Sequence, residues 1–266
     1  MRAADSETVR CRYFFQQPAN VCGFCDFNGH SACFRPSSTV FQLSGELDMS
    51  FKPLATFSLI ASAALLAAAP AQAAIAVNNA NFNYSQTFDS LAASGASNAW
   101  ANDSTIAGWS LFKTNASTVV SSYIADAGSS TAGGIHSYGT DGERALGSIG
   151  SGSFAIGWIA VAFKNTSNAA FTGFKIGFNG EQWRDGGATA PAVPVAHKMA
   201  LEYGFGATFA AVSTWNAPGG NFDWSSPIIT NKSSGATVDG NVAGKVTGLG
   251  GTVATTWAAN DTLWVR

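Results

Sequence analysis

Short apolar runs, each bounded by clusters of Gly, Asn, Ser, Asp and Thr, fill the chain from residue 74 onward. This pattern is typical of many short β-strands joined by turns, and helical periodicity is hard to find in it. We predict about ten strands: Ser85 to Leu91, Trp109 to Lys113, Ser117 to Asp126, Ile135 to Gly139, Arg144 to Ser148, Ser153 to Asn165, Ala170 to Glu181, Ala196 to Gly204, Thr252 to Thr256 and Thr262 to Val265. The pattern therefore predicts an all-β fold.

The longest run, Phe154 to Phe163, is apolar on both faces and predicts a central strand. A polar turn follows it, after which Phe171 to Phe178 alternates large apolar residues with small or polar ones. This predicts that the two strands pair as antiparallel neighbours. Two antiparallel sheets packed face to face would bury them, so we expect a jelly-roll or lectin-like sandwich, with a closed barrel as the alternative.

A different kind of sequence precedes this region. From Met49, Lys52 is followed by the apolar run Leu54 to Pro70 and then by Ala71-Gln72-Ala73. These are the n-region, the h-region and the A-x-A cleavage site of a secretory signal peptide. A transmembrane helix is the alternative, but the run is shorter than the roughly 20 residues that a span needs. We therefore predict a signal-peptide helix over 49–73, a single mature domain over 74–266 without a membrane span, and a secreted or cell-surface location.

Residues 1–48 have no place in front of an export signal, which acts at the N-terminus. We interpret them as a non-native or disordered N-terminal extension, with translation starting at Met49. All four cysteines lie in this extension, where Cys22-x2-Cys25-x4-His30-x2-Cys33 resembles a zinc knuckle. The last gap is two residues, whereas a knuckle has a longer one, and the motif precedes the export signal. We therefore predict no metal site here.

The mature region is nearly neutral, with nine Lys or Arg against eleven Asp or Glu after residue 73. It carries no basic stripe, which argues against a nucleic-acid partner. It also contains no cysteine, no G-x-S-x-G and no phosphate-binding loop, which argues against thiol enzymes, serine hydrolases of that type and P-loop enzymes.

Five short motifs occur in a recognisable order: Thr87-Phe88-Asp89-Ser90-Leu91, Ile106-Ala107-Gly108-Trp109, Gly133 to Gly139, Gly142 to Ser148 and Gly180-Glu181-Gln182-Trp183-Arg184. With these motifs the chain resembles a family of secreted bacterial β-sandwich proteins of unassigned activity, which often carry a C-terminal PEP-CTERM sorting tag. The resemblance implies an exported sandwich linked to the cell surface or its polysaccharide matrix, with no catalytic residues to carry over. The chain lacks the tag and ends at Arg266 directly after a strand-like run, so we expect its closing C-terminal strand to be missing.

The sharpest cluster of functional groups is Glu181, Gln182, Trp183 and Arg184 at the end of a predicted strand. Alternation places Glu181 and Trp183 on one face and the other two residues on the opposite face. An aromatic face beside planar hydrogen-bonding groups suits a sugar ligand. The alternative, which we favour, is that Trp183 fills the core and Arg184 pairs with a carboxylate.

The segment 214–226 is rich in aromatic and turn residues, among them Trp215, Phe222 and Trp224. Its Gly and Pro positions indicate a loop. The loop either offers these aromatic rings to a polysaccharide or folds back over an open end of the sandwich, and the sequence favours neither alternative.

Glu143 and Glu181 are the pair of carboxylates that we would test for glycoside hydrolysis, in which one acts as acid and the other as base or nucleophile. The E-x-D-x-x-E signature of lectin-like glucanases is absent. Structural calcium is an alternative for the turn that carries Asp141, but no D-x-D-x-D-G loop is present. His136 and His197 stand apart in sequence, and we expect hydrogen-bonded structural roles for them. We therefore predict no cofactor.

The sequence favours an exported, non-catalytic β-sandwich that binds extracellular carbohydrate or takes part in surface or matrix adhesion. The ligand-binding candidates are Glu181, Gln182, Trp183, Arg184, Trp215, Phe222 and Trp224. A glycoside hydrolase using Glu143 and Glu181 is one alternative. A structural accessory module of a larger extracellular protein is another.

Overall fold

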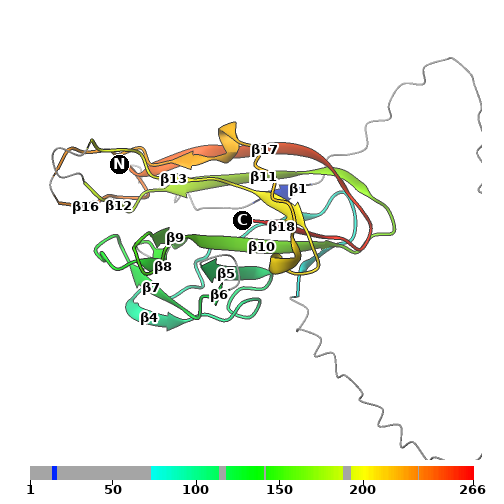
Figure 1. Cartoon of the computed structure of the whole chain (residues 1–266), viewed down its shortest axis with the longest axis horizontal. Coiled ribbons are helices and arrows are strands. Elements are labelled where there is room, and N and C mark those ends of the chain that lie inside the picture. The colour runs from blue at the N-terminus through cyan, green and yellow to red at the C-terminus, as the bar shows by residue number, and fades with distance from the viewer. Residues whose placement is uncertain (1–13, 17–72, 114–117, 141, 188–192, 233) are drawn as a thin grey trace, which may run out of the picture. The chain divides into compact units, whose positions relative to one another are not determined.

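The computed structural model describes residues 14–16, 73–113, 118–140, 142–187, 193–232 and 234–266, all within one compact unit (Figure 1). These residues form β-strands and two short 3₁₀ helices, η1 (Phe209–Ala211) and η2 (Gly220–Phe222). The predicted all-β class is confirmed. None of the described helices is long and apolar enough to cross a membrane. Most of the signal peptide, the cysteine motif, nearly all of the N-terminal extension and Asp141 lie outside the described residues.

One sheet is built around β10 (Gly157–Asn165). It has the strand order β14 (Tyr203–Phe205), β18 (Thr262–Val265), β10, β5 (Trp109–Lys113) and β6 (Thr118–Val119), and β2 (Ile75–Val77) pairs in parallel with β10. The predicted central position of this strand is confirmed, because β10 pairs with β18 on one side and with β5 on the other. β18 is likewise paired on both sides, by β10 and β14.

A second sheet is built around the two longest strands, β11 (Phe171–Glu181) and β17 (Lys245–Trp257), which Figure 1 shows side by side. β1 (Phe14–Gln16) and β3 (Asn83–Tyr84) complete it. Two carbonyls of β17, those of Gly248 and Gly250, accept hydrogen bonds from the side chain of Asn221 at 2.9 and 2.8 Å. β1 lies within residues 1–48, and our interpretation of those residues as an extension stays a prediction.

The predicted pairing of the two central runs is wrong, because β10 and β11 belong to different sheets. The chain crosses between them over residues 166–170, and the buried side chain of Asn165 holds this corner. Its Nδ2 donates to the carbonyls of Ala169, Trp257 and Ala258, and its Oδ1 accepts from Ser167. A polar turn is compatible with a hairpin or with such a crossing, so the sequence pattern alone did not separate them.

A third sheet has the order β4 (Gly95–Ala99), β7 (Ser122–Asp126), β8 (Gly134–Tyr138) and β9 (Ala145–Ile149). Two small ribbons complete the set of sheets. One pairs β12 (Arg184–Asp185) with β16 (Ala236–Thr237), and the other pairs β13 (Lys198–Met199) with β15 (Trp224–Ser225).

Three further predicted strands differ from the structure. Ser117 to Asp126 is divided between β6 and β7, which belong to different sheets. Ser85 to Leu91 is not a strand, because Phe88 has a φ of 62°, a left-handed conformation that an extended strand does not accommodate. Gln86 stabilises this bend by accepting a hydrogen bond from the Phe88 amide at 2.7 Å. Ala196 to Gly204 is interrupted and contributes to β13 and β14, which pair with different neighbours.

The main hydrophobic core takes side chains from both large sheets. Phe174 and Trp257 come from the β11 sheet, and Val161 and Phe163 come from the β10 sheet. On β10, the intervening Ala160 and Ala162 belong to a second core cluster, which also includes Phe209 and Trp264. β10 is therefore apolar on both faces because each face covers a different cluster.

Candidate functional site

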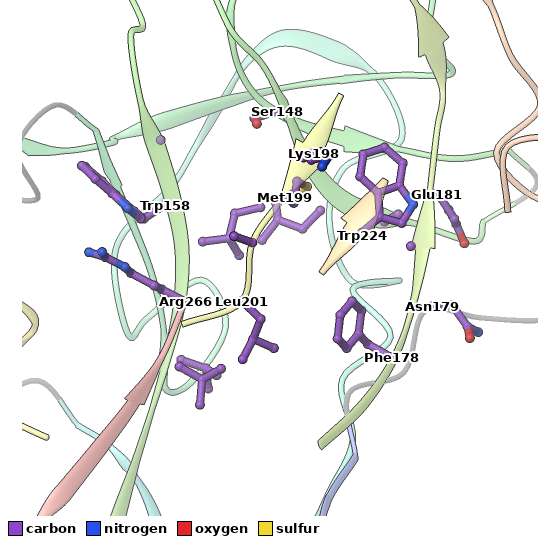
Figure 2. A pocket seen from close by; sticks show the side chains of 18 of the residues that line it. Ser148, Trp158, Phe178, Asn179, Glu181, Lys198, Met199, Leu201, Trp224 and Arg266 are labelled. Carbon is purple, nitrogen blue, oxygen red and sulfur yellow. The ribbon is translucent and has the colours of Figure 1, made fainter. Parts of the chain in front are cut away.

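A cleft of about 380 Å³ lies between β9 and β10 on one side and the end of β11 on the other. Eight aromatic side chains line it: Phe88, Trp109, Tyr138, Trp158, Phe178, Trp183, Phe222 and Trp224. Figure 2 shows Trp158 on one wall and Phe178 and Trp224 on the opposite wall. Concave, mostly apolar sites of this size are typical of small-ligand binding.

Polar groups are placed among these rings. Ser148, Asn179, Glu181, Lys198, Glu202 and Arg266 also line the cleft. Asn179 and Glu181 are alternate residues of β11 and therefore share a face of that strand. The cleft thus combines aromatic surface with groups that donate and accept hydrogen bonds.

The last residue of β11 links the polar and aromatic parts of the cleft. Glu181 accepts a hydrogen bond from Nε1 of Trp183 at 2.9 Å, as two residues on one face can. Trp183 is 3% exposed, and its ring stacks on Tyr138 at a centroid distance of 6.3 Å. Both rings line the cleft. Burial raises the pKa of the Tyr138 hydroxyl well above its ordinary value, and the charge of Asp126 raises it further.

Gln182 and Arg184 lie away from the cleft lining and make structural contacts. The amide of Gln182 is buried and bridges to Ile228, donating to its carbonyl at 2.9 Å and accepting from its N–H at 2.8 Å. Arg184 donates to the carbonyl of Gly128 at 3.0 Å. A ligand role for Gln182 would require breaking its bonds to the 228 segment.

The aromatic residues of segment 214–226 are separated by the fold. Trp224 is 8% exposed and lines the cleft, and the half-buried Phe222 lines it as well. Trp215 is also half-buried but does not line the cleft. Its ring packs against Phe209 at 5.1 Å and lies 3.9 Å from the guanidinium carbon of Arg266.

Arg266 connects the cleft to the second core cluster. Its guanidinium lies over Trp158 at 5.2 Å as well as over Trp215, which is a cation–π arrangement. Its Nε donates to the carboxylate of Glu202 at 2.7 Å. The ion pair and the stacked rings together fix the Trp158 wall.

Trp224 has an unusual indole group. Six tryptophans are buried in the described part of the chain, namely Trp100, Trp109, Trp183, Trp224, Trp257 and Trp264. The other five each donate Nε1–H to a protein oxygen. Nε1 of Trp224 has no acceptor among the described residues. A buried donor without a partner costs about 1–3 kcal/mol.

Glu143 is 4% exposed, and the structure brings it close enough to Glu181 for their charges to interact. Burial, and after it the negative charge of Glu181, raises the pKa of Glu143 to about 7. Asn241 donates to Oε2 of Glu143 at 3.2 Å. Glu143 itself does not line the cleft.

His136 on β8 and Arg144, which directly precedes β9, make hydrogen bonds within the fold. Both ring nitrogens of the buried His136 face acceptors, Oδ2 of Asp126 and the carbonyl of Ala132, each at 2.9 Å. The guanidinium of Arg144, also buried, donates to the carbonyl of Gly139 at 2.8 Å and to Oγ of Ser137 at 2.9 Å. The hydrogen-bonded structural role expected for His136 is confirmed.

Sequence reasoning missed several cleft residues, notably Trp158, Phe178, Asn179 and Arg266. Trp158 lies in a run that is apolar on both faces, a pattern that predicts a central strand and does not indicate a position in a cleft. Asn179 shares a strand face with Glu181, and this alternation is the signal that could have identified it. No sequence signal connects Trp158 to Glu181, because they belong to different sheets.

The fold and the cleft define an all-β protein with a cleft lined largely by aromatic side chains. Comparisons of the chain with protein-family models, with curated proteins and with solved structures found no match. Within the described ranges, no group of three or more His, Cys, Asp and Glu side chains could hold a metal ion.

Proposed function

We propose that this chain is an exported β-sandwich protein that binds an extracellular or cell-surface polysaccharide in the aromatic cleft. The signal-peptide pattern at 49–73 supports export. The sandwich architecture is supported by the main core, which side chains from both large sheets share.

The observation that carries the proposal is the combination of rings and hydrogen-bonding groups in one cleft. Sugar rings have apolar C–H faces and polar hydroxyl rims, so they are bound by aromatic faces flanked by planar polar groups. Trp158 on one wall and Glu181 on the other supply these two kinds of contact.

Titration with soluble polysaccharides, followed by tryptophan fluorescence and calorimetry, tests the proposal. Xylan, mannan, mixed-linkage glucan, dextran and alginate make a suitable panel. At least one should bind saturably, and Trp158→Ala should weaken that binding about tenfold or more, because a large apolar contact is lost.

Trp215→Ala is the matched control. Trp215 is also half-buried and also packs against Phe209 and Arg266, but it lies outside the cleft lining. Its removal should weaken binding far less than removal of Trp158 does, because only its packing against Arg266 is lost. The proposal fails if no polysaccharide binds, or if both variants bind as the wild type does.

A glycoside hydrolase is the second candidate. It is favoured by the raised pKa of Glu143, about 7, beside the negatively charged Glu181. A carboxyl with a raised pKa beside a second carboxylate suits an acid and a base. Binding without hydrolysis ranks first because Glu143 does not line the cleft. Release of reducing ends from the bound polysaccharide, abolished by Glu181→Gln, would reverse this order.

A further inference from the structure

Glu143 and Asn241 are joined by one hydrogen bond, although a carboxyl and an amide can form two. Nδ2 of Asn241 donates to Oε2 of Glu143 at 3.2 Å. The other oxygen of each group, Oε1 of Glu143 and Oδ1 of Asn241, is buried without a donor among the described residues. Glu143 is more than nine-tenths buried, so an unpaired Oε1 is unfavourable. The pair therefore lacks one donor.

A proton on Oε1 supplies that donor. A protonated carboxyl group carries one O–H, which the carbonyl oxygen of an amide can accept. The two side chains are then joined by two hydrogen bonds, and neither oxygen stays unpaired. A hard cation fits less well, because calcium takes about six to eight oxygen ligands, whereas the described residues leave only these two oxygens of the pair without a partner.

The surroundings of Glu143 favour its neutral form. The charged groups that interact with it are Glu181 on β11, Asp89 before β4, Lys245 on β17 and the adjacent Arg144. Burial has the largest effect and, with the charges of Glu181 and Asp89, raises the pKa of Glu143 to about 7, whereas Lys245 and the hydrogen bond from Asn241 oppose the rise. The proton is therefore present below neutral pH.

The pair connects the two sides of the cleft. Glu143 lies shortly before β9, whose residues Ala145, Leu146 and Ser148 line the cleft on one side. Asn241 lies in the turn of residues 239–244, directly before β17. β9 and β17 belong to different sheets.

The 239–244 turn packs against the cleft residue Trp183. A Cβ atom at Gly240 would lie 2.3 Å from Cε2 of Trp183, so the backbone of the turn lies directly on this ring. The carbonyl of Gly244 also accepts a hydrogen bond from the N–H of Gln182 at 2.8 Å. A change in the order of this turn therefore reaches the cleft.

We propose that protonated Glu143 and Asn241 form a pH-dependent latch, in which Oε1–H donates to Oδ1 of Asn241 and holds the 239–244 turn and Trp183 in place relative to β9. Loss of the proton removes this bond and leaves a buried carboxylate beside an amide oxygen, so the turn loosens and the cleft binds its ligand more weakly. The effect on the ligand rests on the proposed carbohydrate-binding function, whereas the latch itself does not.

Heteronuclear ¹⁵N NOE values of the backbone amides of residues 241–244 test the latch without a ligand. In the wild type they should match those of β10 at pH 5.5 and fall at pH 8, where Glu143 is ionised. Glu143→Gln should keep high values at both, because a glutamine amide donates at any pH. Asn241→Ala, which removes the acceptor, should give low values at both. Asp261→Asn removes an exposed carboxylate and should behave as the wild type does.

Titration of xylan, mannan, mixed-linkage glucan, dextran and alginate at the same two pH values tests the regulation. A polysaccharide that binds the wild type at pH 5.5 should bind about tenfold more weakly at pH 8. Glu143→Gln should abolish this difference and retain the higher affinity at pH 8. A residue that only supported the fold would not give this rescue by an amide.

Two results overturn the inference: a turn that stays ordered at pH 8 in the wild type, and an affinity that is the same at both pH values. Ordering of the turn only when calcium is added also overturns it, since a cation would then occupy the place of the proton. Failure of every polysaccharide to bind instead refutes the proposed function, while the NOE values still decide whether the latch exists.

Discussion

Glu143 makes the stability of this protein depend on pH in a defined direction. Its pKa rises from an ordinary value of 4.5 to about 7 in the folded chain, first because it is buried and second because Glu181 is negatively charged. The folded state therefore holds a proton that the unfolded state releases at lower pH. The contribution to stability is fully present below pH 4.5 and is lost as the pH rises through 7.

The magnitude follows from the size of the shift. A rise from 4.5 to about 7 corresponds to about 3 kcal/mol between the two limits, since one pKa unit is worth about 1.4 kcal/mol. The structure supplies a reason why the folded chain favours the protonated form of Glu143. Oε1 of Glu143 and Oδ1 of Asn241 are both buried without a donor among the described residues. A proton on Glu143 neutralises the negative charge of this poorly solvated carboxyl group.

Urea unfolding at pH 5, 6, 7 and 8 measures the effect. The wild type should lose stability steadily over this range. Glu143→Gln should remove most of that slope, because the amide cannot ionise. Glu181→Gln should move the loss to lower pH, because it removes the charge that helps to raise the pKa of Glu143.

Glu202→Gln is the control, because it makes the same chemical change in a carboxylate paired with Arg266. It should keep the pH slope of the wild type. An unchanged slope in Glu143→Gln would refute the reasoning, since other groups would then carry the dependence.

Two further predictions concern packing. Gly180→Ala should displace Trp224, because the new Cβ would meet its ring at 1.9 Å; we expect a loss of about 1–3 kcal/mol and a red-shifted tryptophan emission, whereas Gly152→Ala, where nothing lies within 4 Å, should show neither. Asn165→Ala should lower the free energy of unfolding by about 3 kcal/mol or more, because three backbone carbonyls lose its amide donor. Urea unfolding checks both values, and a loss below about 1 kcal/mol in Asn165→Ala would contradict the assigned role of this corner.

Much of the fold class could be predicted from local patterns. Alternation along Phe171 to Phe178 predicted a strand with one buried face, and the run up to Phe163 predicted a strand buried on both. These predictions succeeded because the side-chain direction in a strand alternates residue by residue, whatever the partner strand is.

The partners of these strands were decided by tertiary structure. β10 and β11 are separated by a short polar turn, yet they lie in different sheets because Asn165 ties the corner to Trp257 and Ala258. Those contacts join residues about ninety positions apart, a separation that no local pattern encodes.

For the cleft, too, the sequence indicated the residue types and the tertiary structure decided how they are arranged. Residue type alone drew attention to Glu143, Glu181 and Trp224, because carboxylates and aromatics carry recognisable chemistry. Their burial and mutual distance, and the separation of Trp224 from Trp215, depend on which strands pack against which. The sequence by itself therefore determined the strand-forming runs and the chemical groups on offer. Only the tertiary structure decided which of them share the cleft, because burial and electrostatic coupling are properties of neighbours in space.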